Sequence, residues 1–349
     1  MLSYSQTIAL ASFAALTFIQ VSIALAYKIA QDSKGSYPFN PPFLLVIAES
    51  LKFVLSICLF ASSRGSRTRS VDGKSGSIEP PDSDLETSPS LYHAQRVDRD
   101  TFLTELISEI RASPTLVPSC LFLAAIYCAN NNVTFYLFSW IDGANINLFK
   151  SGCSIVSTLL LHFALQRTFS QVQWVSVGMQ TLGLGVSQFG ATCSNVPLLS
   201  LALYVVLLLS IFATSLSSVL NDHVLKTNAG TASLHTVNAV LYFFGAIFNA
   251  SVFFLRNESS SLPLLAGFDR LSTWVILAFN VVIGIIVSAV YKYCDATTKT
   301  FASAFSTSLL LLINIFVYGY EFKLVVVLGC LIVFAATYLF VSNPAPSKV

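Results

Sequence analysis

The chain has 349 residues, of which 54% are hydrophobic and 10% are charged, with a formal net charge of +2 and a mean hydropathy of +0.72. A soluble chain would carry about 25% charged residues, so this composition excludes a water-soluble globular protein and favours an integral membrane protein. The seven cysteines are dispersed and lack the spacing of metal ligands, which argues against a zinc site or a disulfide framework. We therefore expect no metal and no other cofactor.

In chain order, ten apolar stretches are long enough to cross the hydrocarbon core as helices, which takes about 20 residues each. They occupy residues 6–28, 41–62, 115–138, 144–166, 171–189, 197–220, 234–254, 272–291, 299–319 and 322–342. The one long polar connection, residues 64–100, is rich in Ser, Pro, Asp and Arg, and we expect it to be disordered. The pattern predicts an all-α membrane protein with ten transmembrane helices.

A short segment between this connection and the third apolar stretch has an amphipathic pattern. In TFLTELISEIRA, one helical face carries only apolar side chains, namely Phe102, Leu103, Leu106, Ile107 and Ile110. We expect the segment either to lie on the membrane surface as an amphipathic helix or to extend the third span into water.

The distribution of basic residues predicts which side of the membrane holds the termini. Ten spans place both termini on one side, and most Lys and Arg residues fall on that side, many of them in the 64–100 connection. The positive-inside rule then predicts cytosolic termini. The sequon Asn257-Glu258-Ser259 falls in a loop that this topology places in the lumen, where glycosylation takes place.

Two parts of the chain resemble each other. WIDGANINLFKSGCSIVSTLLLHFALQRTF and YCDATTKTFASAFSTSLLLLINIFVYGYEF both begin a helix after an aspartate, and 27 residues separate Asp142 from Phe169 and Asp295 from Phe322. The fourth span thus corresponds to the ninth and the fifth to the tenth. An odd number of spans per half predicts two inverted five-helix repeats, residues 1–189 and 190–349. Chance similarity between apolar helices is the alternative.

Polar side chains inside predicted spans mark the candidate site, because burying charge in a bilayer is costly. Glu49 and Lys52 lie three residues apart on one face of the second span, where they either form an internal ion pair or contact a ligand. The third span contains the run Asn130-Asn131-Asn132. Its amides suit the edge of a nucleobase or a sugar, or alternatively hydrogen bonds between helices.

Two lysines stand near the starts of the corresponding fourth and ninth spans. Lys150 has no acidic residue within one helical turn, and Lys299 is followed by a series of Ser and Thr residues. A lysine near a membrane edge often serves as an anchor. Unpaired cations near helix N-termini in both repeats favour instead a site for an anion, phosphate above all.

Several motifs, taken in order, resemble the nucleotide-sugar transporters of the Golgi and endoplasmic reticulum, in the branch that carries CMP-sialic acid, UDP-galactose and UDP-N-acetylglucosamine. They are AESLK, NNNVTFYLFSWIDGA, RTFSQVQW and KYCDATTKTFASA. The last resembles the family's Lys-Tyr-x-Asp-x-x-x-Lys/Arg-x-Phe element. The resemblance covers nearly the whole chain outside 64–100 and implies a ten-helix drug/metabolite-transporter fold.

The resemblance also implies a function and site residues. It implies exchange of a UDP-sugar, UDP-galactose or UDP-N-acetylglucosamine, for a nucleoside monophosphate across the Golgi membrane, by alternating access and without enzymatic chemistry. The positions that match the family's binding residues are Lys299 for phosphate, Asn131 and Asn132 near the nucleotide, Asn238, Thr214, and Ser288 beside a further hydroxyl position.

The sequence departs from the family pattern at three positions. The usual arginine and glutamine around Asn238 are Val237 and Val240, and the second phosphate lysine aligns with Cys153, three residues after Lys150. The long Lys150 side chain is expected to reach the same phosphate. The departures leave open CMP-sialic acid, another phosphorylated organic anion, or a non-transporting partner protein as alternatives, together with location in the endoplasmic reticulum and a homodimer.

Overall fold

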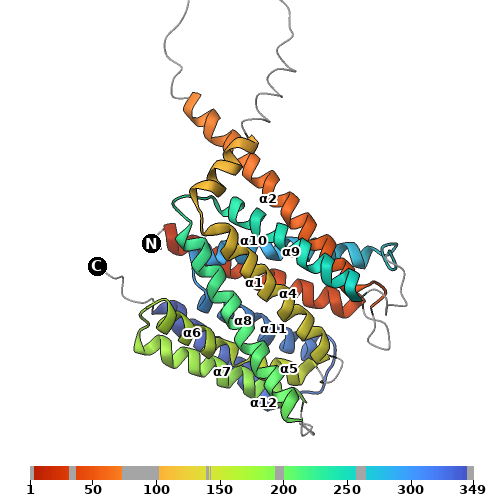
Figure 1. Cartoon of the computed structure of the whole chain (residues 1–349). Coiled ribbons are helices and arrows are strands. Elements are labelled where there is room, and N and C mark those ends of the chain that lie inside the picture. Colours follow the sequence, from red (N-terminus) through yellow and green to blue (C-terminus); the bar gives the residue numbers. More distant parts are fainter. Residues whose placement is uncertain are drawn as a thin grey trace, which may run out of the picture.

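The computed structural model describes residues 4–30, 37–72, 102–138, 141, 143–192, 200–256 and 265–343. Within these ranges every regular element is a helix, as an all-α membrane protein requires (Figure 1). The helices are α1 (Tyr4–Ala30), α2 (Pro41–Asp72), a short helix over residues 102–112, α4 (Leu116–Phe138), α5 (Gly143–Lys150), α6 (Cys153–Ala164), α7 (Gln171–Thr192), α8 (Leu201–Thr227), α9 (Leu234–Arg256), α10 (Leu271–Tyr293), α11 (Ala296–Phe316) and α12 (Leu324–Ser342).

Eight of the described helices are long and apolar enough to cross a membrane. They are α1, α2, α4, α8, α9, α10, α11 and α12. The predicted fourth span is divided into α5 and α6, and its apolar part, Leu148–Ala164, is shorter than the others. The predicted fifth span is α7, whose polar residues, such as Gln173 and Gln180, lower its hydropathy. The chain is thus a multi-pass membrane protein, and the count of ten spans stays a prediction.

The second helix continues beyond its apolar part. α2 runs to Asp72, so residues 64–72 are helical and not part of the irregular connection predicted for residues 64–100. The extension SSRGSRTRSVD contains no proline, so nothing in it removes a backbone donor or forces the helix to stop at the membrane edge. Residues 73–101 lie outside the described part of the chain, as do Asp142 and the sequon at Asn257.

The 102–112 helix is separate from α4 and packs beside α2 and α9. A turn at residues 113–115 divides the two helices, so the segment is not a straight extension of the third span. The ring of Phe102 lies tilted against that of Phe60 of α2, with ring centroids 5.5 Å apart. Glu109 Oε2 accepts a hydrogen bond from the Ser233 amide (2.8 Å) at the start of α9. This carboxylate satisfies a free N–H group at a helix N-terminus.

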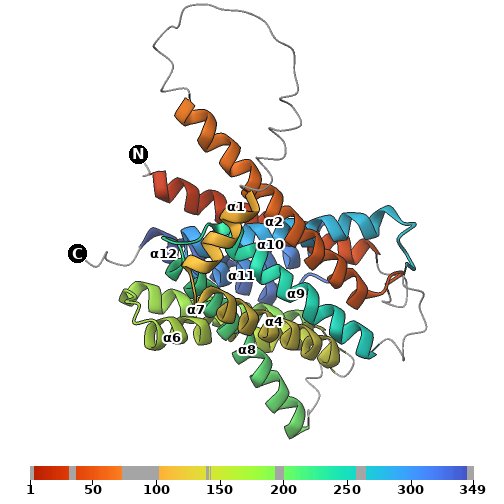
Figure 2. The same cartoon turned by 45° about the horizontal axis from the view of Figure 1, so that its top comes forward.

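The helices form one bundle in which α4 and α8 lie between two groups. α1, α2, α9 and α10 lie on one side of this pair, and α5, α6, α7 and α12 lie on the other (Figures 1 and 2). The largest buried apolar cluster joins α4, α6, α8, α9, α10 and α11 through residues such as Leu123, Leu161, Val219, Tyr242 and Tyr291. In both views α1 begins and α12 ends on the side that holds the α6–α7 connection.

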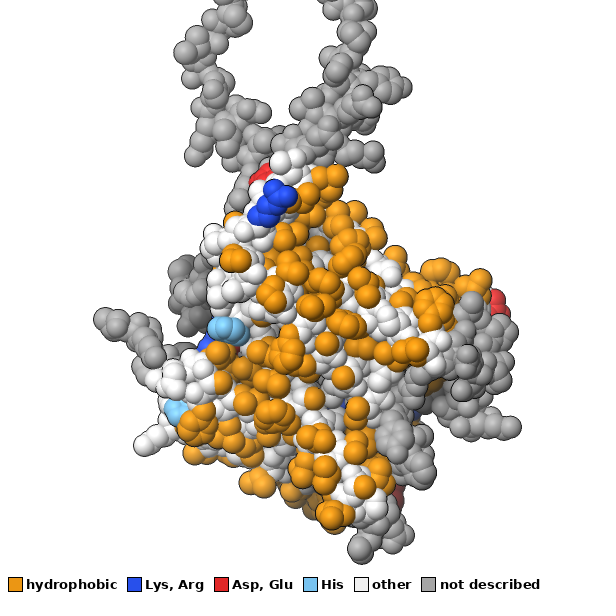
Figure 3. Space-filling model, in the orientation of Figure 1, with side chains coloured by type: hydrophobic (Ala, Val, Ile, Leu, Met, Phe, Trp, Pro, Cys, Tyr) orange, Lys and Arg blue, Asp and Glu red, His pale blue; other side chains and the backbone are white. Residues whose placement is uncertain are grey.

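Exposed apolar side chains cover the outside of the bundle. Figure 3 shows hydrophobic side chains over the middle of one face, with the visible charged groups largely at its margins. Phe18, Leu182 and Phe254 are each at least 70% exposed. Such a surface would be unstable in water, whereas lipid tails cover it well.

α7 and α12 pack closely at two glycines, Gly183 and Gly329. A Cβ atom on Gly329 would lie 2.7 Å from the Gly183 carbonyl oxygen and 2.6 Å from the Ser187 nitrogen. Small residues at such a crossing allow the backbones to pack directly, which is how membrane helices gain van der Waals contact. Gly183 and Gly329 therefore serve the packing of α7 on α12.

Candidate functional site

The break between α5 and α6 places Lys150 at the end of a half-length helix. The amides of Ser151 and Gly152 bond to carbonyl oxygens three residues back, at 3.2 and 3.1 Å, in place of the α-helical spacing of four. The turn tightens there and α6 begins anew at Cys153. Interrupted helices of this kind often build ligand sites within membrane proteins, because they bring backbone groups and side chains to a cavity.

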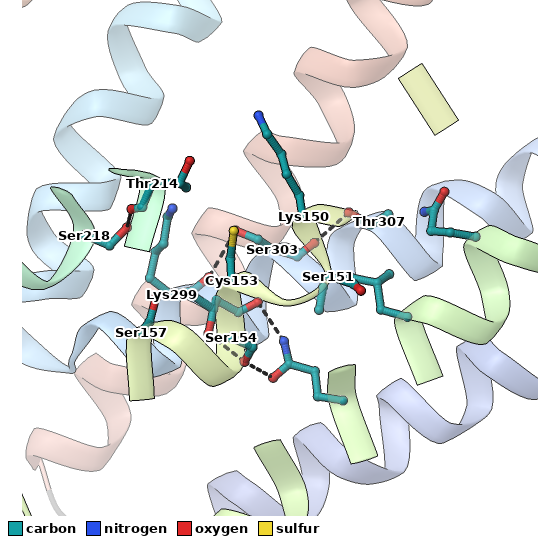
Figure 4. A pocket seen from close by; sticks show the side chains of 15 residues that line it. Lys150, Ser151, Cys153, Ser154, Ser157, Thr214, Ser218, Lys299, Ser303 and Thr307 are labelled. Atoms are coloured by element: carbon teal, nitrogen blue, oxygen red, sulfur yellow. Dashed lines mark hydrogen bonds between the residues drawn. The ribbon is translucent and has the colours of Figure 1, made fainter. Parts of the chain in front are cut away.

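A cavity of about 170 Å³ lies beside this break, between α5, α6, α7, α8 and α11 (Figure 4). Its described lining includes two lysines and many hydroxyl groups, and no Asp or Glu. The lining residues are Lys150, Ser151, Cys153, Ser154, Ser157, Gln180, Leu184, Gln188, Thr214, Ser218, Lys299, Thr300, Ser303, Ala304 and Thr307. The lining therefore carries positive charge and several hydroxyl groups.

Lys299 reaches the cavity from the first turns of α11. Asp295 caps this helix by accepting a hydrogen bond from the Thr298 amide at 2.6 Å, so the predicted helix start after an aspartate is confirmed here. Figure 4 shows the Lys299 side chain extending into the space that Thr214 and Ser218 line. Among the described residues, no carboxylate lies within 4.0 Å of its ammonium group.

Lys150 lines the same cavity from the end of α5. Its ammonium group donates a hydrogen bond to Thr134 Oγ1 of α4 at 3.3 Å, and it is close enough to Lys299 for the two charges to repel each other. Cys153, at the position where the family pattern has lysine, lines the same cavity near both lysines. An anion between the two ammonium groups would relieve this repulsion.

The three adjacent asparagines of α4 have different surroundings. Asn130 binds α8, donating to Thr214 Oγ1 (3.1 Å) and accepting from Ser210 Oγ (3.2 Å), as the alternative of helix–helix bonding predicted. Asn132 donates to the Cys128 carbonyl oxygen of its own helix at 2.8 Å. Asn131 shares a helix face with Tyr127 and with Thr134, the partner of Lys150, because residues three and four apart are neighbours on a helix.

The remaining predicted residues do not line this cavity. Asn238 of α9 is 0% exposed, and both its amide atoms lack a hydrogen-bond partner among the described residues. Ser288 of α10 donates to the Gly284 carbonyl oxygen at 3.1 Å and lies 3.5 Å from the Tyr242 hydroxyl.

Glu49 and Lys52 form a nearly buried ion pair with an N–O distance of 2.7 Å. The pair is enclosed by α9 and α10. A Cβ atom on Gly245 would lie 2.9 Å from Glu49 Oε2, and one on Gly284 would lie 2.9 Å from Lys52 Cε. The two charges satisfy each other within the bundle.

Three buried tyrosines that the sequence does not single out lie between this ion pair and the cavity. Tyr127 accepts a hydrogen bond from Asn221 Nδ2 (3.1 Å), also hydrogen-bonds Tyr291, and lies near Lys299. Tyr242 faces the Lys52 ammonium, 5.4 Å from its ring centroid. Tyrosine occurs commonly in apolar spans, so no spacing distinguished these three from packing residues.

Comparison with known proteins gives the class of protein. The family model described as nucleotide-sugar transporter matches residues 87–341, and this chain therefore belongs to the nucleotide-sugar transporter family. The family assignment confirms the resemblance drawn from the motifs.

Individual relatives carry different substrate names. The chain is 28% identical to CMP-sialic acid transporter 3 of Arabidopsis thaliana over 233 residues, which cover 64% of this chain and 57% of that protein. It is 22% identical to the UDP-galactose transporter senju of Drosophila melanogaster over 352 residues, covering 90% and 81%. A solved structure described only as the crystal structure of a protein has a TM-score of 0.56, 15% identity and coverage of 96% and 97%, and is alike in fold.

Proposed function

We propose that this chain exchanges a UDP-sugar, UDP-galactose or UDP-N-acetylglucosamine, for the corresponding nucleoside monophosphate by alternating access across the Golgi membrane. The observation that carries the proposal is the cavity that holds Lys150 and Lys299 and has no described carboxylate in its lining. Cations without counter-charge inside a bilayer are costly, so a ligand that brings negative charge into the cavity is favoured.

The polar groups around the lysines support phosphate as that ligand. Ser157 Oγ is buried, lines the cavity and has no hydrogen-bond partner among the described residues. A phosphate oxygen would accept its hydrogen bond while Lys299 supplies a charge-assisted one. Substrate and product share the nucleotide phosphate, so one site binds both, as exchange requires.

We propose that asparagines and hydroxyl groups beyond the lysines read the base and the sugar. Asn131 lies on the α4 face that carries Tyr127 and Thr134. Asn132 is the next residue of α4, and Thr214 of α8 lines the cavity. The buried amide of Asn238 lacks partners among the described residues, and a nucleobase edge would supply both a donor and an acceptor. Ser288 would support this part of the site through Tyr242.

Glu49 and Lys52 have a supporting role in this proposal. Their charges are mutually neutralised at 2.7 Å, and the pair is wedged against the glycines of α9 and α10. It would hold α2 in place behind the tyrosines and would not contact phosphate.

The helix contacts support a ten-helix layout of two inverted repeats, 1–189 and 190–349. In this layout α1, α2, α4, α5/α6 and α7 correspond to α8, α9, α10, α11 and α12. α1 packs on α10 and α11, while α8 packs on α4 and α6; likewise α4 packs on α9, while α10 packs on α2. α2, α6 and α7 each pack on their own counterparts. A two-fold axis within the membrane plane produces such pairing.

A CMP-linked sugar is the second candidate substrate, because the plant relatives are named CMP-sialic acid transporters. Other phosphorylated anions and a non-transporting role as a partner protein are further outcomes of the test below. Location in the endoplasmic reticulum and assembly as a homodimer belong to the same proposal as alternatives.

The test uses the full chain, purified and reconstituted in liposomes preloaded with UMP, CMP or buffer. Uptake of labelled UDP-galactose, UDP-N-acetylglucosamine, CMP-sialic acid and a hexose phosphate is measured. We expect uptake of a UDP-sugar that internal UMP stimulates. Stimulation only by internal CMP would show that the exchanged nucleotide is CMP and not UMP. Uptake of hexose phosphate alone would show that the substrate is a phosphorylated sugar without a nucleotide. A folded protein that takes up none of these compounds would refute transport.

A further inference from the structure

A cluster of charged side chains closes the end of the bundle where α6 and α8 end and α11 begins. Arg167, in the α6–α7 connection, contacts Asp222 of α8 at 3.0 Å and Asp295 at 3.8 Å. Lys226 contacts the other oxygen of Asp222 at 2.6 Å and donates to the Cys294 carbonyl oxygen. The Asp222 side chain is 0% exposed. This cluster belongs to neither the cavity nor the Glu49–Lys52 pair.

The backbone holds Arg167 in a fixed position. Gln166, at the end of α6, has a φ of 51°, a left-handed conformation that residues other than glycine adopt uncommonly. The Arg167 amide then donates to the Leu161 carbonyl oxygen (3.1 Å), and His162 Nδ1 donates to the Arg167 carbonyl oxygen (2.8 Å). The chain reverses at this point and directs the guanidinium group across to α8 and α11.

Two hydroxyl contacts lie between this cluster and the cavity. Ser154 and Thr300 are 3.2 Å apart, and Thr158 and Thr297 are 3.4 Å apart, and these contacts join α6 to α11. Thr158 and Thr297 are 0% exposed. Ser154 and Thr300 line the cavity, so the cavity ends where the two helices meet. The charged cluster lies further along the same helices.

The composition of the cluster suits a contact that breaks and re-forms. A buried ion pair adds little net stability compared with apolar packing, because both charges lose water. If Arg167 moves away, Asp222 keeps Lys226 as a partner on its own helix, and Asp295 keeps its role as the cap of α11. Neither carboxylate is left without a partner, and Arg167 regains water. Arg167 is the only described member that belongs to the proposed first repeat.

We propose that Arg167 is the gate residue of this end: its contacts with Asp222 and Asp295 hold the cavity closed here, and they must break for a substrate to enter or leave on this side. The proposal rests on the proposed transport function and adds to it the residues that regulate access. The predicted topology makes this the cytosolic end, because α1 begins and α12 ends on the same side (Figure 2).

The test measures the width of this end directly, without reference to any substrate. Spin labels are attached through incorporated non-natural amino acids at Thr168 and His223, both exposed, so that the native cysteines stay in place. Distances between the labels are recorded for the full chain in lipid nanodiscs. The Arg167→Gln variant is expected to move most of the population to a longer distance, whereas Arg167→Lys, which keeps the charge, retains more of the short one.

Two further measurements complete the test. Asp295→Asn removes one carboxylate charge but keeps a good helix cap, so it is expected to open the end to a smaller extent without unfolding α11. Exchange transport of Arg167→Gln is expected to fall about fivefold or more, because the equilibrium between the two access states is displaced, while UMP binding persists. Unchanged distances in both Arg167→Gln and Asp295→Asn would overturn the gate, even if the wild-type chain transports. If the wild-type chain does not transport but the variants change the distance as expected, the proposed function is refuted and the gate at Arg167 is retained.

Discussion

Two groups of basic side chains lie on either side of the contact between α6 and α11 and differ in what faces them. Lys299 and Lys150 enter a cavity whose described lining has no carboxylate. Beyond that contact, Arg167 and Lys226 are matched by Asp222 and Asp295. The comparison shows that the position of a cation in the bundle does not decide its role. The presence or absence of a counter-charge does, because only an unmatched cation gains from binding an anion.

The largest expected effect comes from removing one partner of the buried Glu49–Lys52 ion pair. Glu49→Ala would leave Lys52 charged and nearly buried, which costs about 3–5 kcal/mol of stability. The double variant Glu49→Ala/Lys52→Leu should regain most of that loss, since no charge remains. The stability of both variants is measured by thermal unfolding in detergent, followed with a fluorescent probe that does not react with thiols. A single variant as stable as the wild type would show that the pair does not support the bundle.

The next effect concerns the unmatched lysine of α11. Lys299→Ala should weaken UMP binding by roughly tenfold to a hundredfold, the value of about 1.5–3 kcal/mol for a hydrogen bond to a charged group. Thermal stability should change little, because the ammonium group has no described carboxylate partner. Lys292→Ala is the matched control: Lys292 is exposed at the end of α10 and outside the cavity. Equal UMP affinity in Lys299→Ala and wild type would remove phosphate from the proposed site.

A smaller effect is expected for the second lysine. Lys150 already donates to Thr134 Oγ1, so part of its hydrogen-bonding capacity is used within the protein. Lys150→Ala should reduce UMP affinity by about 1 kcal/mol, roughly fivefold. Calorimetric titration of UMP into the purified chain measures it. A loss as large as that of Lys299→Ala would show that the two lysines share the phosphate equally.

The smallest expected effects concern two neighbouring asparagines, Asn130 and Asn131, whose substitution should give different phenotypes. Asn130→Ala removes the hydrogen bonds to α8 and should cost about 0.6 kcal/mol of stability, the average for such bonds in membranes, with little change in nucleotide selectivity. Asn131→Ala should leave stability unchanged and alter the relative uptake of UDP- and CMP-sugars. The reverse assignment of the two phenotypes would mean that Asn130, not Asn131, faces the ligand.

Much of the fold followed from the sequence because the bilayer imposes a length. A stretch of about 20 apolar residues has few alternatives to a spanning helix, and helices such as α9 (Leu234–Arg256) and α12 (Leu324–Ser342) begin and end within a few residues of the prediction. The extension of α2 to Asp72 was missed because a helix outside the membrane has no such limit. The break after Lys150 was missed because the segment GANINLFKSGCS contains no proline that would mark an interruption of the span.

The sequence by itself determined the membrane class, the positions of most helices and the presence of unusual charge, since these depend on composition and local spacing. It also named Lys150 and Lys299 together, through the similarity of two segments. Only the tertiary structure decided which charges are matched. Arg167, Asp222 and Asp295 are far apart in the chain, and their contact depends on how α6, α8 and α11 pack. An ion pair forms over a few ångströms in space, and no local pattern of residues specifies that distance.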